Sequence, residues 1–120
     1  MKLILTGNIP SKKNSRINTR TGRSFPSVDY QRWQNDAIWQ VVSQKIKWFR
    51  EPVRLDIVLY FSKRGRADMD NKLSSILDML VKAEVLLDDS YEYVPEINLK
   101  AVYRKGEAGA EVEFTPVEKP

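Results

Sequence analysis

The feature that most constrains the fold is a strand-like run that is followed, after a short basic segment, by a helix-like run. In residues 53–61 apolar side chains alternate with the others, which indicates a β-strand with one well-buried face. In residues 71–83 apolar side chains recur at spacings of three and four, which predicts an amphipathic helix with Asp70 or Asn71 at its cap. The chain is therefore expected to form a sheet on which helices pack.

The rest of the chain extends this pattern into one small domain. Residues 2–9, 93–104 and 110–115 are typical of strands, residues 105–109 of a hairpin turn, and residues 27–47 of a helix. Trp39 and Trp48 fall off the apolar stripe of that helix, so we expect them outside the core. The predicted fold is a single α+β domain over residues 1–120 with the order β-α-β-α-β-β, in which helices pack on one face of a mixed four-stranded sheet.

Composition excludes several kinds of chemistry. The chain of 120 residues contains no cysteine and no histidine. Disulfides, zinc–thiolate sites, Ser-His-Asp triads and histidine metal ligands are therefore excluded, and catalysis must use carboxylates, lysines, tyrosines, hydroxyls or a metal with oxygen ligands. No apolar run approaches the length of a membrane span and the start does not read as a signal peptide, so we expect a cytoplasmic protein with no membrane partner.

Charge is distributed unevenly along the chain. Residues 1–50 carry a net charge of +8, whereas residues 68–120 carry −6. Residues 10–27 contain five basic side chains, many hydroxyls and amides, and no acid. Such a segment suits contact with DNA phosphates, and the alternative is a plain surface loop. The expected phosphate contacts are Lys12, Lys13, Asn14, Arg16, Arg20 and Arg23, together with Arg64, Arg66 and Lys72 on either side of an acidic cluster.

The acidic cluster consists of two pairs of carboxylates. Asp68 and Asp70 lie at the junction between the predicted strand and helix, and Asp88 and Asp89 follow the helix. Carboxylates this close in sequence repel one another unless positive charge lies among them. Mg²⁺ takes oxygen ligands and is usually held by one or two carboxylates plus substrate phosphates, so the cluster suits a Mg²⁺-type site. The alternative interpretation is that Asp68 and Asp70 only cap the helix, where negative charge is favourable.

Several motifs together resemble the RusA family of Holliday junction resolvases. They are Asp68-Met69-Asp70-Asn71, the helical run Ile76-Leu77-Asp78-Met79-Leu80-Val81-Lys82-Ala83, the acidic Leu87-Asp88-Asp89, and Pro10-Ser11-x-x-Asn14 before the basic loop. The resemblance covers most of the chain and implies a RusA-like fold and a homodimeric, Mg²⁺-dependent endonuclease, with Mn²⁺ as an alternative metal. Such enzymes make paired symmetric nicks in four-way DNA junctions during recombination and repair, and phages and prophages often encode them. The resemblance assigns the catalytic and metal-binding roles to Asp68, Asp70 and Asp89.

One position departs from the family pattern. The family commonly has a functional lysine three residues after the motif asparagine, where this chain has Ser74. On a helix the nearest lysine, Lys72, points about 160° away from that position, so Lys63, Arg66 or Lys82 would have to supply the charge. Two further hypotheses therefore stay open. One is a catalytically weak or inactive protein that binds junction or duplex DNA, and the other is an acidic-patch protein that binds no DNA.

The length of the predicted helix limits how the acids can meet. Asp70 and the end of a helix over residues 71–83 would be about 20 Å apart. Residues 84–89 reach about 20 Å when fully extended, so Asp89 can barely return to Asp70 within one chain. Either the helix is shorter, or Asp89 completes the site of the other subunit in a dimer.

Overall fold

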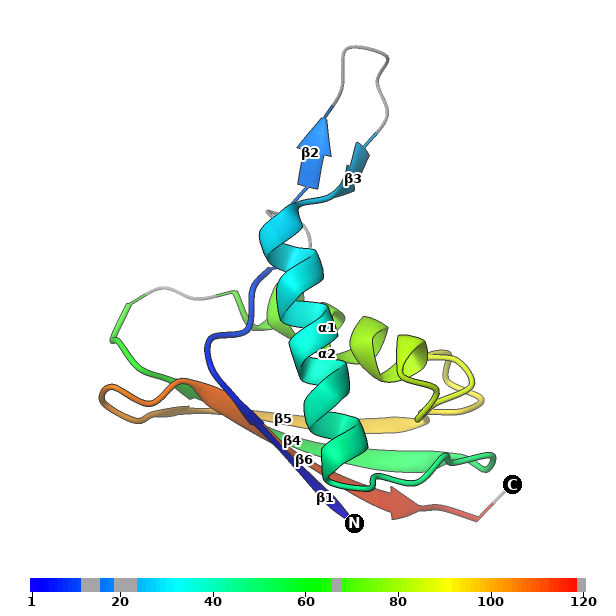
Figure 1. Cartoon of the computed structure of the whole chain (residues 1–120). Coiled ribbons are helices and arrows are strands. Elements are labelled where there is room, and N and C mark those ends of the chain that lie inside the picture. The colour runs from blue at the N-terminus through cyan, green and yellow to red at the C-terminus, as the bar shows by residue number, and fades with distance from the viewer. Residues whose placement is uncertain (12–15, 19–23, 66–67, 119–120) are drawn as a thin grey trace.

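The residues that the structure describes form one mixed sheet, two helices and a separate pair of short strands (Figure 1). The computed structural model describes residues 1–11, 16–18, 24–65 and 68–118. The strands are β1 (Lys2–Thr6), β2 (Arg16–Asn18), β3 (Ser24–Pro26), β4 (Val53–Phe61), β5 (Glu96–Tyr103) and β6 (Gly109–Pro116), and the helices are α1 (Val28–Ser43) and α2 (Met69–Lys82). Strands β2 and β3 pair with each other and stand away from the main sheet as an arm (Figure 1). None of the helices in these ranges is long and apolar enough to cross a membrane.

The main sheet has the strand order β1-β6-β4-β5. Strand β6 is antiparallel to both of its neighbours, so that Val112 lies opposite Leu3 on one side and Ile57 on the other. Strand β5 is instead parallel to β4, with Phe61 opposite Tyr103, because α2 carries the chain back to the start of the sheet between them. Strands β4 and β5 therefore finish at the same end of the sheet, next to the segment that leads into α2.

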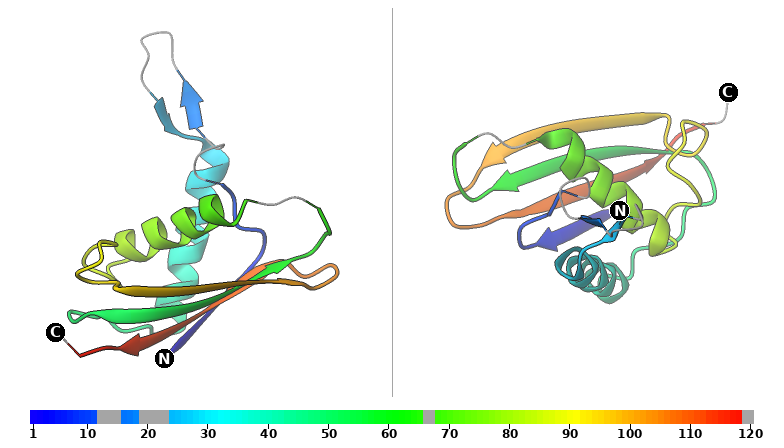
Figure 2. Two further views of the ribbon diagram at one scale, coloured as in Figure 1. Left: turned by 180° about the vertical axis from the view of Figure 1, so that it is seen from behind. Right: turned by 90° about the horizontal axis from the view of Figure 1, so that it is seen from above.

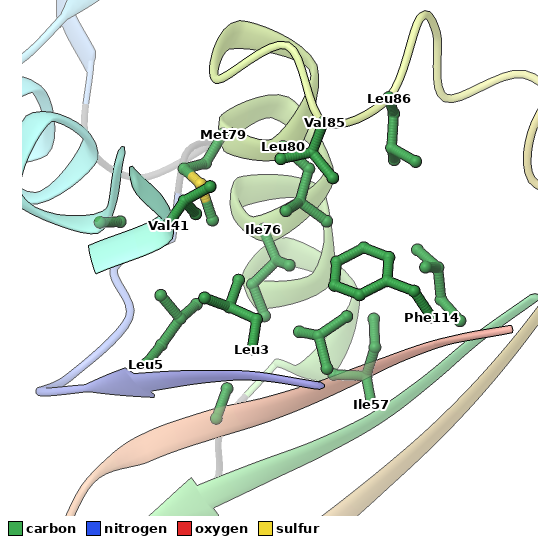
Figure 3. Close-up of a cluster of buried hydrophobic side chains, with 14 of the residues drawn as sticks. Leu3, Leu5, Val41, Ile57, Ile76, Met79, Leu80, Val85, Leu86 and Phe114 are labelled. Carbon is green, nitrogen blue, oxygen red and sulfur yellow. The ribbon is translucent and has the colours of Figure 1, made fainter. Parts of the chain in front are cut away.

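Both helices lie on the same face of the sheet, and α2 provides much of the core (Figures 1 and 3). Ile76, Met79 and Leu80 of α2 are fully buried against strand residues that include Leu3 and Ile57. Burial of side chains of this size contributes about 1.5–3 kcal/mol each. A further tie joins the two helices, because the buried Gln34 side chain of α1 donates to the Asp78 carboxylate of α2 at 3.0 Å. The helix that carries the acidic motif is thus fixed by packing along its length.

Helix α1 also covers the β1 edge of the sheet. The Gln44 side chain accepts from the Ile4 backbone N–H (2.8 Å) and donates to the Ile4 carbonyl (2.6 Å). The Gln40 side chain accepts from the Thr6 backbone N–H at 2.9 Å. These two glutamines do for β1 what a neighbouring strand would do, because they satisfy backbone groups that face out of the sheet.

The predicted α+β fold class, the mixed four-stranded sheet and the order of its strands and helices are confirmed. Strand β4 has the predicted bounds, and Trp39 and Trp48 lie outside the core, with 68% and 47% of their surfaces exposed. The β2–β3 pair was not predicted. The apolar residue Val42 is 60% exposed, because α1 buries another flank, which contains Tyr30, Ala37 and Val41.

Candidate active site at the two ends of helix α2

The N-terminal end of α2 is built around Asp68. This residue is the N-cap, since its side chain accepts from the Asp70 backbone N–H (3.1 Å) and from the Asn71 side chain (2.7 Å). The capping interpretation is therefore correct for Asp68, whereas the predicted cap at Asp70 or Asn71 was wrong by two or three residues. Each carboxylate oxygen keeps a further lone pair after these bonds, so capping the helix and binding a cation are compatible.

Asp70 lies in the first turn of α2 and is exposed. Within the described ranges its carboxylate makes no hydrogen bond or ion pair, so both of its oxygens are open to a ligand. Helical spacings of three and seven place Leu73 and Leu77 on the same side of α2 as Asp70. Both leucines are only partly buried. The free carboxylate thus stands at one end of a half-exposed apolar strip.

Lys72 and Ser75 connect the first turns of α2 to the segment that leads into the β2–β3 arm. The Lys72 ammonium donates to the Ile9 carbonyl and lies 5.7 Å from the centre of the Phe61 ring. The buried Ser75 hydroxyl donates to the next carbonyl, that of Pro10, at 2.7 Å. Burial also lowers the pKa of Lys72 below its usual value, because desolvation penalises the charged form. Sequence reasoning missed this tie, since nothing in the local pattern links residues so far apart in the chain.

The C-terminal end of α2 leads to the second acidic pair. Helix α2 has 14 residues, so its ends are about 21 Å apart. Asp88 and Asp89 follow it and are both exposed, and the Asp88 carboxylate accepts from the Asp89 backbone N–H at 2.8 Å. Figures 1 and 2 show this segment, in yellow-green, at the opposite end of α2 from Met69. The shorter-helix alternative is therefore wrong, and Asp89 does not join Asp68 and Asp70 within one chain.

The two ends differ in how well they suit a metal ion. In the described part of the chain no group of three or more acidic side chains converges to hold a metal. Asp68 and Asp70 nevertheless provide two neighbouring, exposed carboxylates, and one or two carboxylates plus phosphate oxygens are the usual ligands of Mg²⁺ in proteins. The N-terminal end of α2 thus fits a hard divalent cation that substrate oxygens help to hold.

The predicted DNA-binding residues fall into three groups. Lys12, Lys13, Asn14, Arg20, Arg23 and Arg66 lie outside the described residues. The backbone of Arg16 lies in β2. Arg64 is exposed beside the start of α2, with its guanidinium 4.6 Å from the centre of the Tyr103 ring, whereas the Lys72 ammonium is turned to the Ile9 carbonyl instead of outward.

Comparison with known proteins fits this arrangement of a mixed sheet and an acidic strand–helix junction. The family model of endodeoxyribonuclease RusA matches residues 7–115. The chain therefore belongs to the RusA family of endodeoxyribonucleases. It is also similar to the crossover junction endodeoxyribonuclease RusA of Aquifex aeolicus (strain VF5), with 28% identity over 110 residues, which cover 91% of this chain and 86% of that relative.

Proposed function

We propose that this protein resolves four-way DNA junctions by metal-dependent hydrolysis of phosphodiester bonds. The observation that carries the proposal is the exposed pair Asp68 and Asp70, fixed at the N-terminal end of a buried helix in a chain of the RusA family. The Aquifex aeolicus relative is named for crossover junctions, which supports the same substrate here. We propose that Mg²⁺, or Mn²⁺ in its place, is the metal.

The residues have distinct tasks in this proposal. Asp68 and Asp70 would bind the cation, and the Asn71 amide would hold the Asp68 carboxylate in place through its 2.7 Å bond. A bound cation would polarise the phosphodiester and lower the pKa of a water molecule. Arg64 would hold a phosphate near the two carboxylates, whose charge would otherwise repel it. Water supplies the oxygen for the new bond to phosphorus, and the bond to the leaving oxygen of the sugar breaks.

Asp89 would complete the site of a second subunit. The surface between the two acidic ends of α2 supports this part of the proposal. Leu73 and Leu77 of α2 and Ile97 and Leu99 of β5 are partly buried apolar residues along the β5 edge of the sheet. No strand covers that edge within the described part of the chain. An apolar strip beside an uncovered strand is typical of a surface that packs against another chain.

Two-fold symmetry would join the separated acids. A two-fold axis near the middle of α2 would place the N-terminal end of one helix beside the C-terminal end of its partner helix. Each dimer would then contain two sites, each made of Asp68 and Asp70 from one chain and Asp89 from the other. A four-way junction has strands related by two-fold symmetry, so two such sites suit paired nicks.

The first test is nicking of a labelled four-way junction and of a linear duplex with the same arms. We expect nicks at symmetric positions in the junction with Mg²⁺, none with EDTA, and none in the duplex. Asp70→Asn should lower the nicking rate by about 100-fold or more, because a metal ligand is lost while its size is kept. The matched control is Asp36→Asn on α1, which removes the same charge away from the acidic ends. Equal nicking by wild type and Asp70→Asn would overturn the proposed site.

A mixing experiment tests the shared site. If the acids act across the dimer, mixing Asp70→Asn chains with Asp89→Asn chains gives heterodimers with one intact site and one doubly altered site. Nicking should then return without paired cleavage, and at most about half of the dimers would carry an intact site. If all the acids act within one chain, no intact site forms, and mixtures stay as inactive as either variant alone.

A second candidate is a protein that binds junctions without cutting them. The observation that favours it is the engagement of Lys72 with the Ile9 carbonyl, since this leaves no lysine beside Asp70 on the described part of α2. Ser74 is exposed one turn after Asp70. If wild type binds but does not nick, Ser74→Lys should restore nicking, whereas Ser43→Lys on α1 adds the same charge elsewhere and should not. Rapid nicking by wild type would eliminate this candidate.

A further inference from the structure

The end of the sheet at which β4 and β5 finish carries a group of cations that charge counting along the sequence does not reveal. Two of them, Arg104 and Lys105, belong to the acidic half of the chain. The turn that contains them lies against the segment after β4, because the Arg104 backbone N–H donates to the Phe61 carbonyl (2.8 Å) and the Gly106 N–H donates to the Ser62 carbonyl (3.3 Å). We name this group the strand-end rim, and it consists of Lys63, Arg64, Arg104 and Lys105.

Aromatic rings order both arginines of the strand-end rim. The Arg104 guanidinium carbon lies 3.7 Å from the centre of the Tyr60 ring, and that of Arg64 lies 4.6 Å from the centre of the Tyr103 ring. A ring occupies the face of a guanidinium and leaves its N–H edges free to donate to phosphate oxygens. An arginine that is already ordered loses less side-chain entropy on binding than a free one.

The charge of the strand-end rim is only partly neutralised. Glu107 is the acid that pairs with it among the described residues, since its carboxylate lies 3.3 Å from Arg104 Nε. That pair is largely exposed, and Lys63, Arg64 and Lys105 have no ion pair with any described residue. Because exposed ion pairs contribute little, a phosphate can compete with Glu107 for the guanidinium.

The N-terminal end of α2, which carries Asp68 and Asp70, separates the strand-end rim from the β2–β3 arm. Figures 1 and 2 show the start of α2 between the root of the arm and the segment that follows β4. On the helix side of the sheet, a pocket of about 340 Å³ is lined by Lys63, Arg64, Met69 and Tyr103 among others, so it reaches from the rim to the first residue of α2. A DNA strand that passes Asp68 and Asp70 can therefore extend to the strand-end rim.

We infer that the strand-end rim is a second phosphate-binding surface, which holds the backbone of a junction arm other than the one that is cut beside Asp68 and Asp70. This inference rests on the proposed function for its substrate but makes a separate claim about binding. Each phosphate contact adds about 0.9 to the slope of log affinity against log salt concentration on duplex DNA. A second arm exists in a junction and not in a linear duplex, so the rim should matter more for the junction.

The test compares two double variants that remove the same charge. Lys63→Gln/Lys105→Gln alters the strand-end rim but keeps Arg64, which the proposed function places beside Asp68 and Asp70, and Lys2→Gln/Lys100→Gln alters exposed lysines on the outer face of the sheet. Binding of a four-way junction and of a linear duplex is measured by fluorescence anisotropy in EDTA, between 50 and 200 mM salt. We expect the rim variant to lose about 1–2 units of salt slope and about tenfold or more in junction affinity. The rim variant should lose less affinity for the linear duplex, and the control variant Lys2→Gln/Lys100→Gln should bind both DNAs as wild type does.

Two further results make the interpretation unambiguous. Arg104→Lys keeps the charge but not the guanidinium stacked on Tyr60, so it should keep the salt slope and lose only part of the affinity. Thermal unfolding of each variant confirms that the fold persists. A rim variant that binds the junction like the control would overturn the inference, as would wild type that binds no DNA. If wild type binds the junction through the rim but never nicks it, the proposed function is wrong while the inference about the rim stands.

Discussion

The two edges of the main sheet differ in how their backbone groups are treated. At the β1 edge, Gln40 of α1 and its C-cap Gln44 bind the backbone groups of Thr6 and Ile4. At the β5 edge, no hydrogen bond from another described element reaches the outward side of the strand, and the helix-side residues Ile97 and Leu99 are only partly buried. An edge that is closed by side chains cannot pair with another chain, whereas an open one can. The first residue of α2, Met69, lines a pocket together with Ala101 and Tyr103 of β5, so the acidic N-terminal end of α2 lies beside the open edge, and we place the second subunit there.

The largest effect should come from a charge placed at the open edge. Ala101 lies on the helix side of β5, in register with Leu59, and is exposed. Ala101→Glu would place a carboxylate inside the proposed dimer, which costs roughly 2–5 kcal/mol and weakens association by about 30-fold or more. Light scattering after gel filtration should show monomers, and junction nicking should fall with the dimer.

The control for this change is Ile4→Glu on β1. Ile4 is also exposed, at 50%, but faces away from the helices, so an acid there should leave both the dimer and nicking as they are. A dimer that persists in Ala101→Glu and is lost in Ile4→Glu would reverse the assignment of the two edges.

The sequence predicted the elements whose side chains follow a regular period. Strand β4 and helix α2 each bury one face continuously, and their sequence patterns alone predict that the acidic pair lies at a strand–helix junction. Strands β2 and β3 were not predicted, because each has three residues, which are too few to show an alternating pattern.

The contacts that position the candidate site were not predictable in the same way. Lys72 binds the Ile9 carbonyl and Gln44 binds Ile4, and both are contacts between residues more than 35 positions apart. A helical period shows which side of a helix a residue occupies but not which distant segment lies there. The separation of Asp70 from Asp89 was predictable only in part. Helix length gives the distance that must be spanned, but it does not show whether residues 84–89 run back along the helix or away from it.

A moderate effect should follow from opening the closed edge. Gln44→Ala removes both partners of Ile4, an N–H donor and a carbonyl acceptor. A hydrogen bond of this kind contributes about 0.5–1.5 kcal/mol, and water can replace part of it at an exposed site, so urea unfolding should show a loss of about 1 kcal/mol. Asn35→Ala, an exposed change on the same helix, is the control and should not destabilise the protein. If unfolding of Gln44→Ala matches that control, the glutamine bonds do not stabilise the edge.

The smallest effect should come from a side-chain hydrogen bond between β4 and β5, in which Asp56 accepts from Asn98. The Asp56 carboxylate of β4 accepts from the Asn98 side chain of β5 at 2.9 Å and also pairs with Arg54 at 3.0 Å, and these bonds lower the pKa of Asp56. A pKa lower in the folded than in the unfolded chain stabilises the protein above the unfolded value. That contribution is lost as the pH falls through the folded value.

Asp56→Asn should therefore reduce stability slightly at neutral pH, and its difference from wild type should shrink in acid, below the usual range of an aspartate. Urea unfolding of both proteins between pH 3 and pH 7 measures this difference. The Asp56–Asn98 bond joins β4 to β5, the strand at the open edge. Amide hydrogen exchange in the variant should therefore become faster in β5 and not in β1. A difference that stays constant with pH would mean that the Asp56 charge makes no contribution, and that the β4–β5 backbone pairing and the packing of Ile97 and Leu99 hold the strand in place.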